Sequence, residues 1–325
     1  MQVKLGRSFW VLPVFFAVAL LAVAACGGDD EEVGGPSPSP TAGTTPAPTT
    51  PTVVNFDVTI TDGHGDELTF DEPPERVVAL APSFVEIICA VDVCDVLVAV
   101  DENSNYPPEV ESITKLSGFD PSVEGIVASE PDLVVISFDP GGLEDALEGL
   151  GIPVLFLESP RSLTEVYDQI AVLGDVVGKR AQAAGVVADM QSRVAAVASL
   201  LPVGGGPSVY HELDSTLFSV GPGSFIGDLY DVLGAANIAN ATGSAFPQLS
   251  NEAIIEANPE VIILGDEGLG ETVESVAARP GWDAIAAVQT GRIHGIEPDL
   301  ISRPGPRIVD ALEDLAKVLY PEIFE

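Results

Sequence analysis

Two short segments of this chain share one pattern, and each puts a glutamate near the start of an expected helix. They cover residues 122–133 and 250–261, so the second begins 128 residues after the first. In each copy a serine can accept hydrogen bonds from the unpaired amides of the first helical turn, and a proline ends the helix. The helix dipole favours a carboxylate in that turn. We therefore expect Glu124 and Glu252 either to complement their own helices or to present one acidic side chain per copy.

Few other side chains have the spacing that catalysis or metal binding requires. No nucleophile elbow, zinc-ligand ladder or clustered pair of acids is present in the sequence. The histidines, His64, His211 and His294, are far apart, so we expect structural or surface roles for them and no metal site. The glycines of residues 221–227 lack the spacing of a dinucleotide-binding loop. We interpret that segment as a tight turn from a strand into a helix capped by Ser224.

Cys89 and Cys94 are candidates for a disulfide. On one continuous helix their Cα atoms would be about 8–9 Å apart, which is beyond the reach of a disulfide. A bridge therefore requires the helix to end between them, and Asp92 and Val93 can supply that break. The alternative is a pair of buried thiols.

Length and composition predict about two folded domains and exclude one class of partner. The chain has 325 residues and is 46% apolar, which is enough for two cores. Its 50 acidic and 13 basic residues give a net charge of −37. Nucleic acid is excluded as a partner, because binding phosphates needs clustered lysines and arginines.

The N-terminal residues have the pattern of an export and anchoring signal. Lys4 and Arg7 precede an apolar stretch over residues 9–25, and the sequence around Cys26 resembles the bacterial lipobox, in which the cysteine is acylated. We predict a lipoprotein signal peptide over residues 1–26; the alternative is an uncleaved anchor. Both place the rest of the chain outside the cytoplasmic membrane. Residues 27–53 are rich in proline and threonine and are predicted to be a disordered linker.

The remaining sequence alternates strands and helices and predicts an α/β fold with two Rossmann-like lobes, each built on a central parallel sheet. Residues 54–162 form the predicted N-terminal lobe, which begins with a hairpin. Residues 163–202 carry no strand signal and form a connecting helical region with one long helix over 182–201. Residues 203–325 form the C-terminal lobe with a closing helix. The expected segments are strands over 77–80, 97–100, 133–137, 154–157, 208–211, 217–220 and 261–264, and helices over 82–90, 143–150 and 306–319.

Several motifs, taken in order, resemble the periplasmic binding proteins for vitamin B12 and iron–siderophore complexes. The resemblance covers about residues 58–324, and its motifs are residues 76–83 with Glu86, 105–108, 221–228, 246–250, 279–282 and 303–307. It implies a ligand cleft between two lobes joined by a single long α-helix. It also implies a monomeric, non-enzymatic protein without a cofactor, lipid-anchored to the outer face of the cytoplasmic membrane. Such a protein delivers its ligand to the dimeric permease and ATPase of an ABC importer, and the resemblance makes Glu124 and Glu252 the residues that dock on permease arginines.

The resemblance to the B12-binding members also assigns the ligand site. Its aromatic positions match Tyr106, Phe138 and Phe246, and its polar positions match Asp299 and Arg303. The alternatives are core packing for the phenylalanines and a rigid turn for Tyr106. This chain departs from the pattern near Gly118, where it has phenylalanine instead of the tryptophan found in many B12 binders.

The expected ligand is cobalamin or another corrinoid, with a ferric siderophore or haem second. Anionic siderophores usually need several basic residues, and the whole chain has four lysines. Two other classes of protein remain as alternatives. An extracellular enzyme on the same scaffold would need cysteine ligands for a metal cluster, for which two cysteines are too few. A domain that senses its ligand without delivering it is the third possibility.

Overall fold

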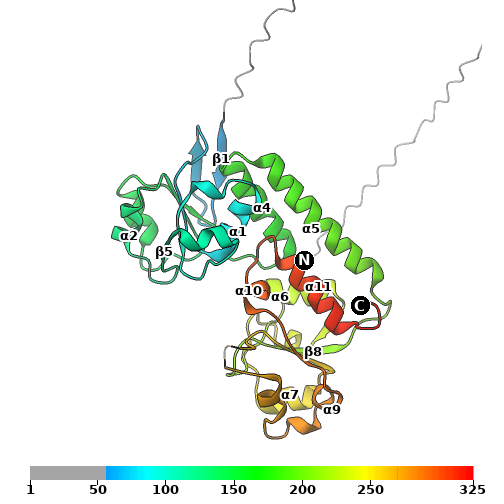
Figure 1. Ribbon diagram of the computed structural model, residues 1–325. Coiled ribbons are helices and arrows are strands. Elements are labelled where there is room, and N and C mark those ends of the chain that lie inside the picture. The colour runs from blue at the N-terminus through cyan, green and yellow to red at the C-terminus, as the bar shows by residue number, and fades with distance from the viewer. Residues whose placement is uncertain (1–55, 269, 325) are drawn as a thin grey trace, which may run out of the picture. The chain divides into compact units, whose positions relative to one another are not determined.

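The computed structural model describes residues 56–268 and 270–324 (Figure 1). The predicted signal peptide, the predicted acylation site Cys26 and the predicted linker over residues 27–53 lie outside the described residues. Within the described part, no helix combines the length and the apolar character needed to cross a membrane.

The N-terminal lobe contains an antiparallel hairpin and a five-stranded sheet. The hairpin pairs β1 (Val58–Thr61) with β2 (Glu67–Phe70). The sheet has the order β5-β4-β3-β6-β7, and all its strands are parallel. Its elements are β3 (Val77–Ala79), α1 (Pro82–Ala90), β4 (Leu97–Asp101), β5 (Thr114–Leu116), α2 (Val123–Ala128), β6 (Leu133–Ile136), α3 (Leu143–Glu148) and β7 (Val154–Phe156), with 3-10 helices η1 (Cys94–Val96) and η2 (Pro108–Ser112).

Helix α1 ends between the two cysteines, as a disulfide requires. Its last residue is Ala90, and Asp92 adopts a left-handed conformation with φ 60°. The chain turns there, so the Cα atoms of Cys89 and Cys94 are 4.2 Å apart. The two residues form a disulfide bond.

The connecting region holds two helices and no strand. They are α4 (Leu163–Val176), which packs against α1, and α5 (Arg180–Leu200), which packs against α4 and α11. A side chain at Gly174 would collide with the Cβ atom of Ala183, so glycine permits the close approach of α4 and α5. The 21 residues of α5 span about 30 Å, and Figure 1 shows this helix running alongside both lobes. The expected long helix is thus α5, and α4 precedes it.

The C-terminal lobe has a four-stranded parallel sheet with the order β11-β10-β8-β9. Its elements are β8 (Ser208–Glu212), α6 (Phe225–Val232), β9 (Ala236–Asn237), α7 (Asn251–Ala257), β10 (Val261–Leu264), α8 (Val273–Ala277), α9 (Ala286–Thr290), β11 (Ile293–Gly295), α10 (Pro298–Ile301) and α11 (Ile308–Leu319), with 3-10 helices η3 (Ile238–Thr242) and η4 (Trp282–Ala284).

The prediction of a strand over residues 217–220 is wrong. Leu217 has φ 68°, which an extended strand cannot contain, and only an isolated antiparallel bridge joins Phe218 to Gln248. The glycine-rich segment after it forms the expected turn, because the Ser224 hydroxyl accepts a hydrogen bond from the Gly227 amide at the start of α6.

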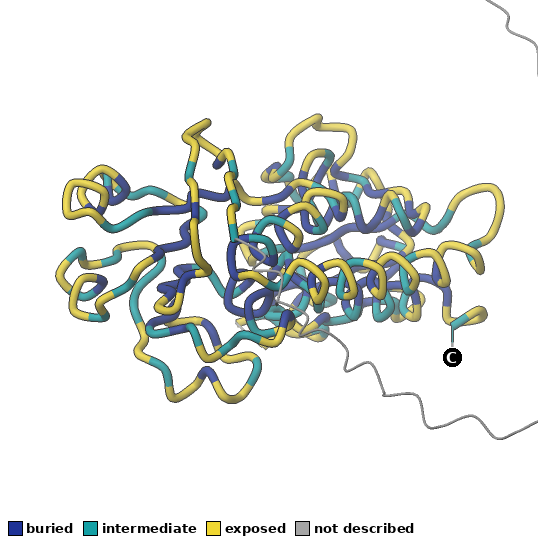
Figure 2. Tube along the Cα trace, turned by 90° about the horizontal axis from the view of Figure 1, so that it is seen from above, coloured by how far each residue is buried: buried dark blue, intermediate teal, exposed yellow. Residues whose placement is uncertain are grey.

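One continuous hydrophobic core joins the two lobes. It contains residues of β3 and α1 in the first lobe, of α4, α5 and α11, and of β8 and α6 in the second. Each sheet has a separate smaller core on its other face. Figure 2 shows the buried segments on the inside of the fold and exposed residues on the outer turns and loops. A shared core of close-packed side chains resists large relative movement of the lobes.

Candidate ligand-binding site

The carboxyl ends of all five strands of the N-terminal sheet open into one cavity. Parallel strands bring these ends to the same edge of a sheet, which is where α/β folds bind ligands. The cavity has a volume of about 360 Å³. Its lining from this lobe comes from the residues after β3 (Leu80 to Phe84), in and after β4 (Asp101 and Asn103), and after β5 (Gly118 and Phe119), β6 (Ser137 and Phe138) and β7 (Glu158 to Pro160).

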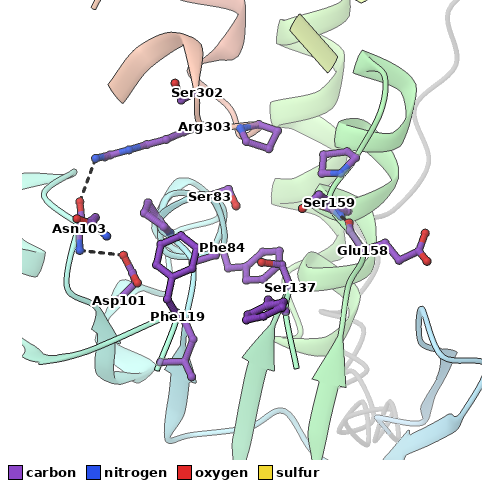
Figure 3. A pocket seen from close by; sticks show the side chains of 18 of the residues that line it. Ser83, Phe84, Asp101, Asn103, Phe119, Ser137, Glu158, Ser159, Ser302 and Arg303 are labelled. Atoms are coloured by element: carbon purple, nitrogen blue, oxygen red, sulfur yellow. Dashed lines mark hydrogen bonds between the residues drawn. The ribbon is translucent and has the colours of Figure 1, made fainter. Parts of the chain in front are cut away.

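The C-terminal half of the chain completes this cavity and adds a second one. Asp299, Ser302 and Arg303, in and just after α10, line the first cavity, and Figure 3 shows Arg303 reaching across to Asn103. A neighbouring cavity of about 740 Å³ shares Ser137 and residues 158–160 with the first and is closed by residues 222–225, Gly243, Ala245 and Phe246 of the second lobe. The two cavities therefore form one cleft between the lobes.

Three phenylalanines in the cleft are unusually exposed. Phe119 is 75% exposed, Phe138 53% and Phe246 51%. Covering an exposed phenyl ring contributes about 1.5–3 kcal/mol, so these rings are suited to hold an apolar or flat ligand. Phe119, which stands where many B12 binders have tryptophan, has the greatest exposure of the three.

The charged groups of the cleft are mostly acidic. Asp101, Glu158 and Asp299 line it, and burial raises the pKa of the Asp101 carboxyl. Among the described lining residues, the cations are Arg161 and Arg303, and each contacts a carboxylate: Arg161 lies 3.8 Å from Glu158, and Arg303 lies 2.7 Å from Asp299. The cleft thus offers little positive charge to an anionic ligand.

Arg303 belongs to a buried network between the lobes. Its guanidinium donates hydrogen bonds to Glu86, to the Asn105 side chain and to the Asn103 carbonyl. Arg307 donates two further hydrogen bonds to Glu86, at 2.9 and 2.6 Å. Glu86 lies in α1 and is only 3% exposed. In the sequence, the residues of this network lie in two of the motifs that carry the family resemblance, Glu86 in one and residues 303–307 in another.

Tyr106 lies outside the cleft, unlike the other predicted ligand residues. It lines a separate cavity of about 560 Å³ with residues of α1, α5 and the segment before α11. The Arg307 guanidinium lies 4.0 Å from the centre of its ring. The structure therefore brings Phe138, Phe246, Asp299 and Arg303 to the cleft, whereas Tyr106 packs against the interlobe network.

The two repeated glutamates occupy equivalent positions on α2 and α7. Ser122 accepts a hydrogen bond from the Gly125 amide and Ser250 from the Ala253 amide, so each helix is capped as expected. Glu124 and Glu252 are both exposed in the first turn. Hydrogen bonds from its own backbone amide and from the Ser122 hydroxyl lower the pKa of Glu124. In Figure 1 the two helices lie in different lobes and away from α5.

None of the three histidines lines the cleft. His211 is fully buried in β8, where burial lowers its pKa to about 3 and its Nδ1 atom lies 2.7 Å from the Tyr230 hydroxyl. Burial also lowers the pKa of His294 in β11. Among the described residues that line the two cavities there is no histidine, tyrosine, cysteine or methionine.

Two α/β lobes that share a core and enclose a cleft at the carboxyl ends of the strands have the architecture of a solute-binding protein. Comparison with known proteins agrees: the family described as periplasmic binding protein matches residues 77–300, and this chain belongs to it. That membership supports a non-enzymatic, solute-binding role and confirms the predicted two-lobed architecture.

Individual relatives cover nearly all of the folded part. The chain is 32% identical over 279 residues to an uncharacterized ABC transporter substrate-binding lipoprotein, YvrC, of Bacillus subtilis, covering 83% of this chain and 88% of that one. It is 32% identical over 280 residues to a cobalamin-binding protein of Halobacterium salinarum, covering 82% and 75%. Among solved structures, the apo periplasmic heme-binding protein RhuT of Roseiflexus sp. RS-1 is 26% identical, with a TM-score of 0.69 and coverage of 76% and 98%.

Proposed function

We propose that this chain is the extracytoplasmic substrate-binding component of an ABC importer and that it captures cobalamin or another corrinoid. The observation that carries the choice of ligand is the set of three exposed phenylalanines in a cleft whose two arginines both contact carboxylates. A corrinoid is a broad, flat ring system whose edge bears amide groups. Phenyl rings cover its faces, and Ser137, Asn103 and the acidic side chains accept or donate hydrogen bonds at its edge. The identity to a cobalamin-binding protein supports the same ligand.

The rival ligands fit the cleft less well. An anionic ferric siderophore is held by unpaired cations, but both arginines in the described lining contact carboxylates. Haem iron is usually held by histidine, tyrosine, cysteine or methionine, and the described lining contains none of these. In a corrinoid the cobalt can keep its own axial ligands, so the protein need not supply one.

Calorimetric titration with cyanocobalamin, haemin and a ferric hydroxamate tests the ligand. We expect saturable binding of cyanocobalamin, and we expect Phe246→Ala and Phe119→Ala each to weaken it about 10- to 100-fold, because each removes about 1.5–3 kcal/mol of apolar contact. Leu150→Ala is the matched control, since Leu150 is 60% exposed at a turn that does not line the cleft. Binding of haemin or the hydroxamate without cyanocobalamin would replace the corrinoid with that ligand.

The proposed delivery step uses Glu124 and Glu252 as the contacts with a dimeric permease. Two exposed carboxylates at equivalent positions of two lobes suit a partner with two-fold symmetry, and opposite charges on the partner would fix the orientation of docking. The alternative, that each glutamate only complements its helix dipole, predicts a small effect on stability and none on transport.

Charge reversal separates these roles. The double variant Glu124→Arg and Glu252→Arg is expected to abolish uptake while cyanocobalamin affinity is unchanged, because neither residue lines the cleft. The matched control reverses two other exposed helix glutamates, Glu148 and Glu274, one in each lobe. Normal uptake with the first variant, or equal loss with both, would rule out docking at these residues.

Membrane anchoring is proposed from the sequence alone. Cys26→Ala is expected to release the protein from the membrane fraction into the soluble one, because acyl chains on that cysteine would be the anchor. A sensor that does not deliver its ligand would bind cyanocobalamin but leave uptake unchanged when it is deleted.

A further inference from the structure

The hairpin turn between β1 and β2 brings a histidine and an aspartate against a glutamate of α3. One ligand atom each from Asp62, His64 and Glu144 lies within 4.8 Å of the other two. His64 Nδ1 is 2.6 Å from Glu144 Oε2. These residues are separated by 80 positions or more between the turn and the helix, so the fold and not a local motif brings them together.

One carboxylate oxygen of Asp62 is buried without a hydrogen-bond partner among the described residues. Its Oδ1 atom accepts hydrogen bonds from the amides of His64, Gly65 and Asp66, which form the turn. Its Oδ2 atom is buried and has no hydrogen-bond partner among the described residues, and Asp62 as a whole is 7% exposed. A buried carboxylate oxygen without a partner is costly, since it has lost water and gained no donor. A cation would supply the missing partner.

The surroundings hold the other two groups in place. The His64 ring stacks on Phe156 of β7, with 3.8 Å between ring centres and 9° between planes. The Gly63 amide donates to the Phe156 carbonyl, which ties the turn to the edge of the sheet independently of any ion. Glu144 is 9% exposed, and its amide donates to Asp139, a further carboxylate beside the cluster.

We propose that Asp62, His64 and Glu144 form a site for a divalent transition-metal cation such as Zn²⁺, with solvent completing its coordination. One imidazole nitrogen and two carboxylate oxygens are ligands that Zn²⁺ accepts, whereas Mg²⁺ and Ca²⁺ prefer oxygen ligands throughout. Binding of the ion releases the proton shared by His64 Nδ1 and Glu144 Oε2 to solvent, and the two atoms move apart from 2.6 Å to about 3.3 Å so that each can ligate the ion. The His64 side chain is 40% exposed, so the ion has a path from solvent.

The site would link the N-terminal hairpin to α3, and through His64 to Phe156 at the end of β7. Phe156, on which His64 stacks, also lines the second cavity of the cleft. This inference does not depend on the corrinoid ligand or on docking, because the metal ligands include neither docking glutamate and none of the three exposed phenylalanines of the cleft.

Calorimetric titration of the chelator-treated protein with ZnCl₂ tests the site. We expect one saturable site, with Zn²⁺ affinity about 100-fold or more lower in His64→Gln and Glu144→Gln, since loss of a direct ligand exceeds the 10- to 100-fold effect of outer contacts. Asp62→Asn is the sharpest variant, because an amide oxygen can still accept from the turn while the nitrogen cannot bind a metal. His294→Gln is the matched control for loss of an imidazole elsewhere.

A second measurement separates the specific site from weak binding to the acidic surface. Zn²⁺ is expected to slow amide hydrogen exchange in residues 58–70 of the unsubstituted protein and not in Asp62→Asn, and MgCl₂ is expected to have no effect. Equal Zn²⁺ affinity in His64→Gln, an equal loss in His294→Gln, or the absence of any saturable site would overturn the proposal.

Discussion

Removal of the Glu86 charge should destabilise the junction of the two lobes more than any surface substitution. Glu86 is 3% exposed and accepts hydrogen bonds from Arg303 and Arg307, which are more than 200 positions away. Loss of one member of a buried ion pair costs about 3–5 kcal/mol, because the remaining charge is left buried. Arg303 keeps its contact with Asp299, and Arg307 keeps the Tyr106 ring. We therefore expect Glu86→Gln to cost about 3 kcal/mol.

Urea unfolding followed by circular dichroism measures this cost. For a slope of about 3 kcal/mol per molar, the midpoint of Glu86→Gln should fall by about 1 M. The matched control is Glu313→Gln, which also removes a carboxylate from an arginine, but its partner Arg193 is 31% exposed and Glu313 35% exposed. That pair should contribute less than about 1 kcal/mol. Equal shifts in the two variants would refute the claim that burial makes the Glu86 network important.

Three further predictions concern groups away from the cleft. Burial and the neighbouring Glu212 raise the pKa of Asp266 to about 6, so ionisation of this carboxyl opposes folding. The free energy of unfolding should therefore fall as the pH rises from about 4 to 6. Asp266→Asn should remove that fall in urea unfolding and add up to about 3 kcal/mol of stability at pH 7. Replacing Cys89 and Cys94 together by alanine should cost about 2 kcal/mol, because the bridge closes a short loop of about six residues, and reducing agent should lower the thermal midpoint only of the unsubstituted protein. Ser122→Ala and Ser250→Ala should each cost about 1 kcal/mol in thermal unfolding, the usual effect of losing a helix cap.

Local signals were sufficient to predict most of the fold. Strands β6 and β10 are short, continuously apolar and buried along their whole length, as expected of parallel strands with helices on both sides. Ser122, Ser224 and Ser250 each cap the helix expected after them. Both kinds of signal depend on neighbouring residues in the chain, which is why they can be found without knowledge of the fold.

The features that could not be predicted depend on distant residues or on single backbone angles. Strand β9 has only two residues, which is too few for a periodic pattern. The apolar segment at Leu217 has the composition of a strand, but the positive φ angle of that residue breaks it. Tyr106 faces Arg307 and not the cleft, a choice fixed by contacts with α5 and the segment before α11. The motifs that contain Glu86, Arg303 and Arg307 did not predict their pairing, because it joins residues more than 200 positions apart.

The shared core and the Glu86 network have a joint consequence for the proposed docking step. A hinge that moved the lobes widely would have to expose residues of the common core and separate buried charges, and both changes are costly. We therefore expect Glu124 and Glu252 to keep nearly the same spacing with and without ligand. A permease that recognises that spacing would bind the empty protein as well as the loaded one. Discrimination between the two states must then come from the rim of the cleft, where the exposed phenylalanines are either hydrated or covered by the ligand.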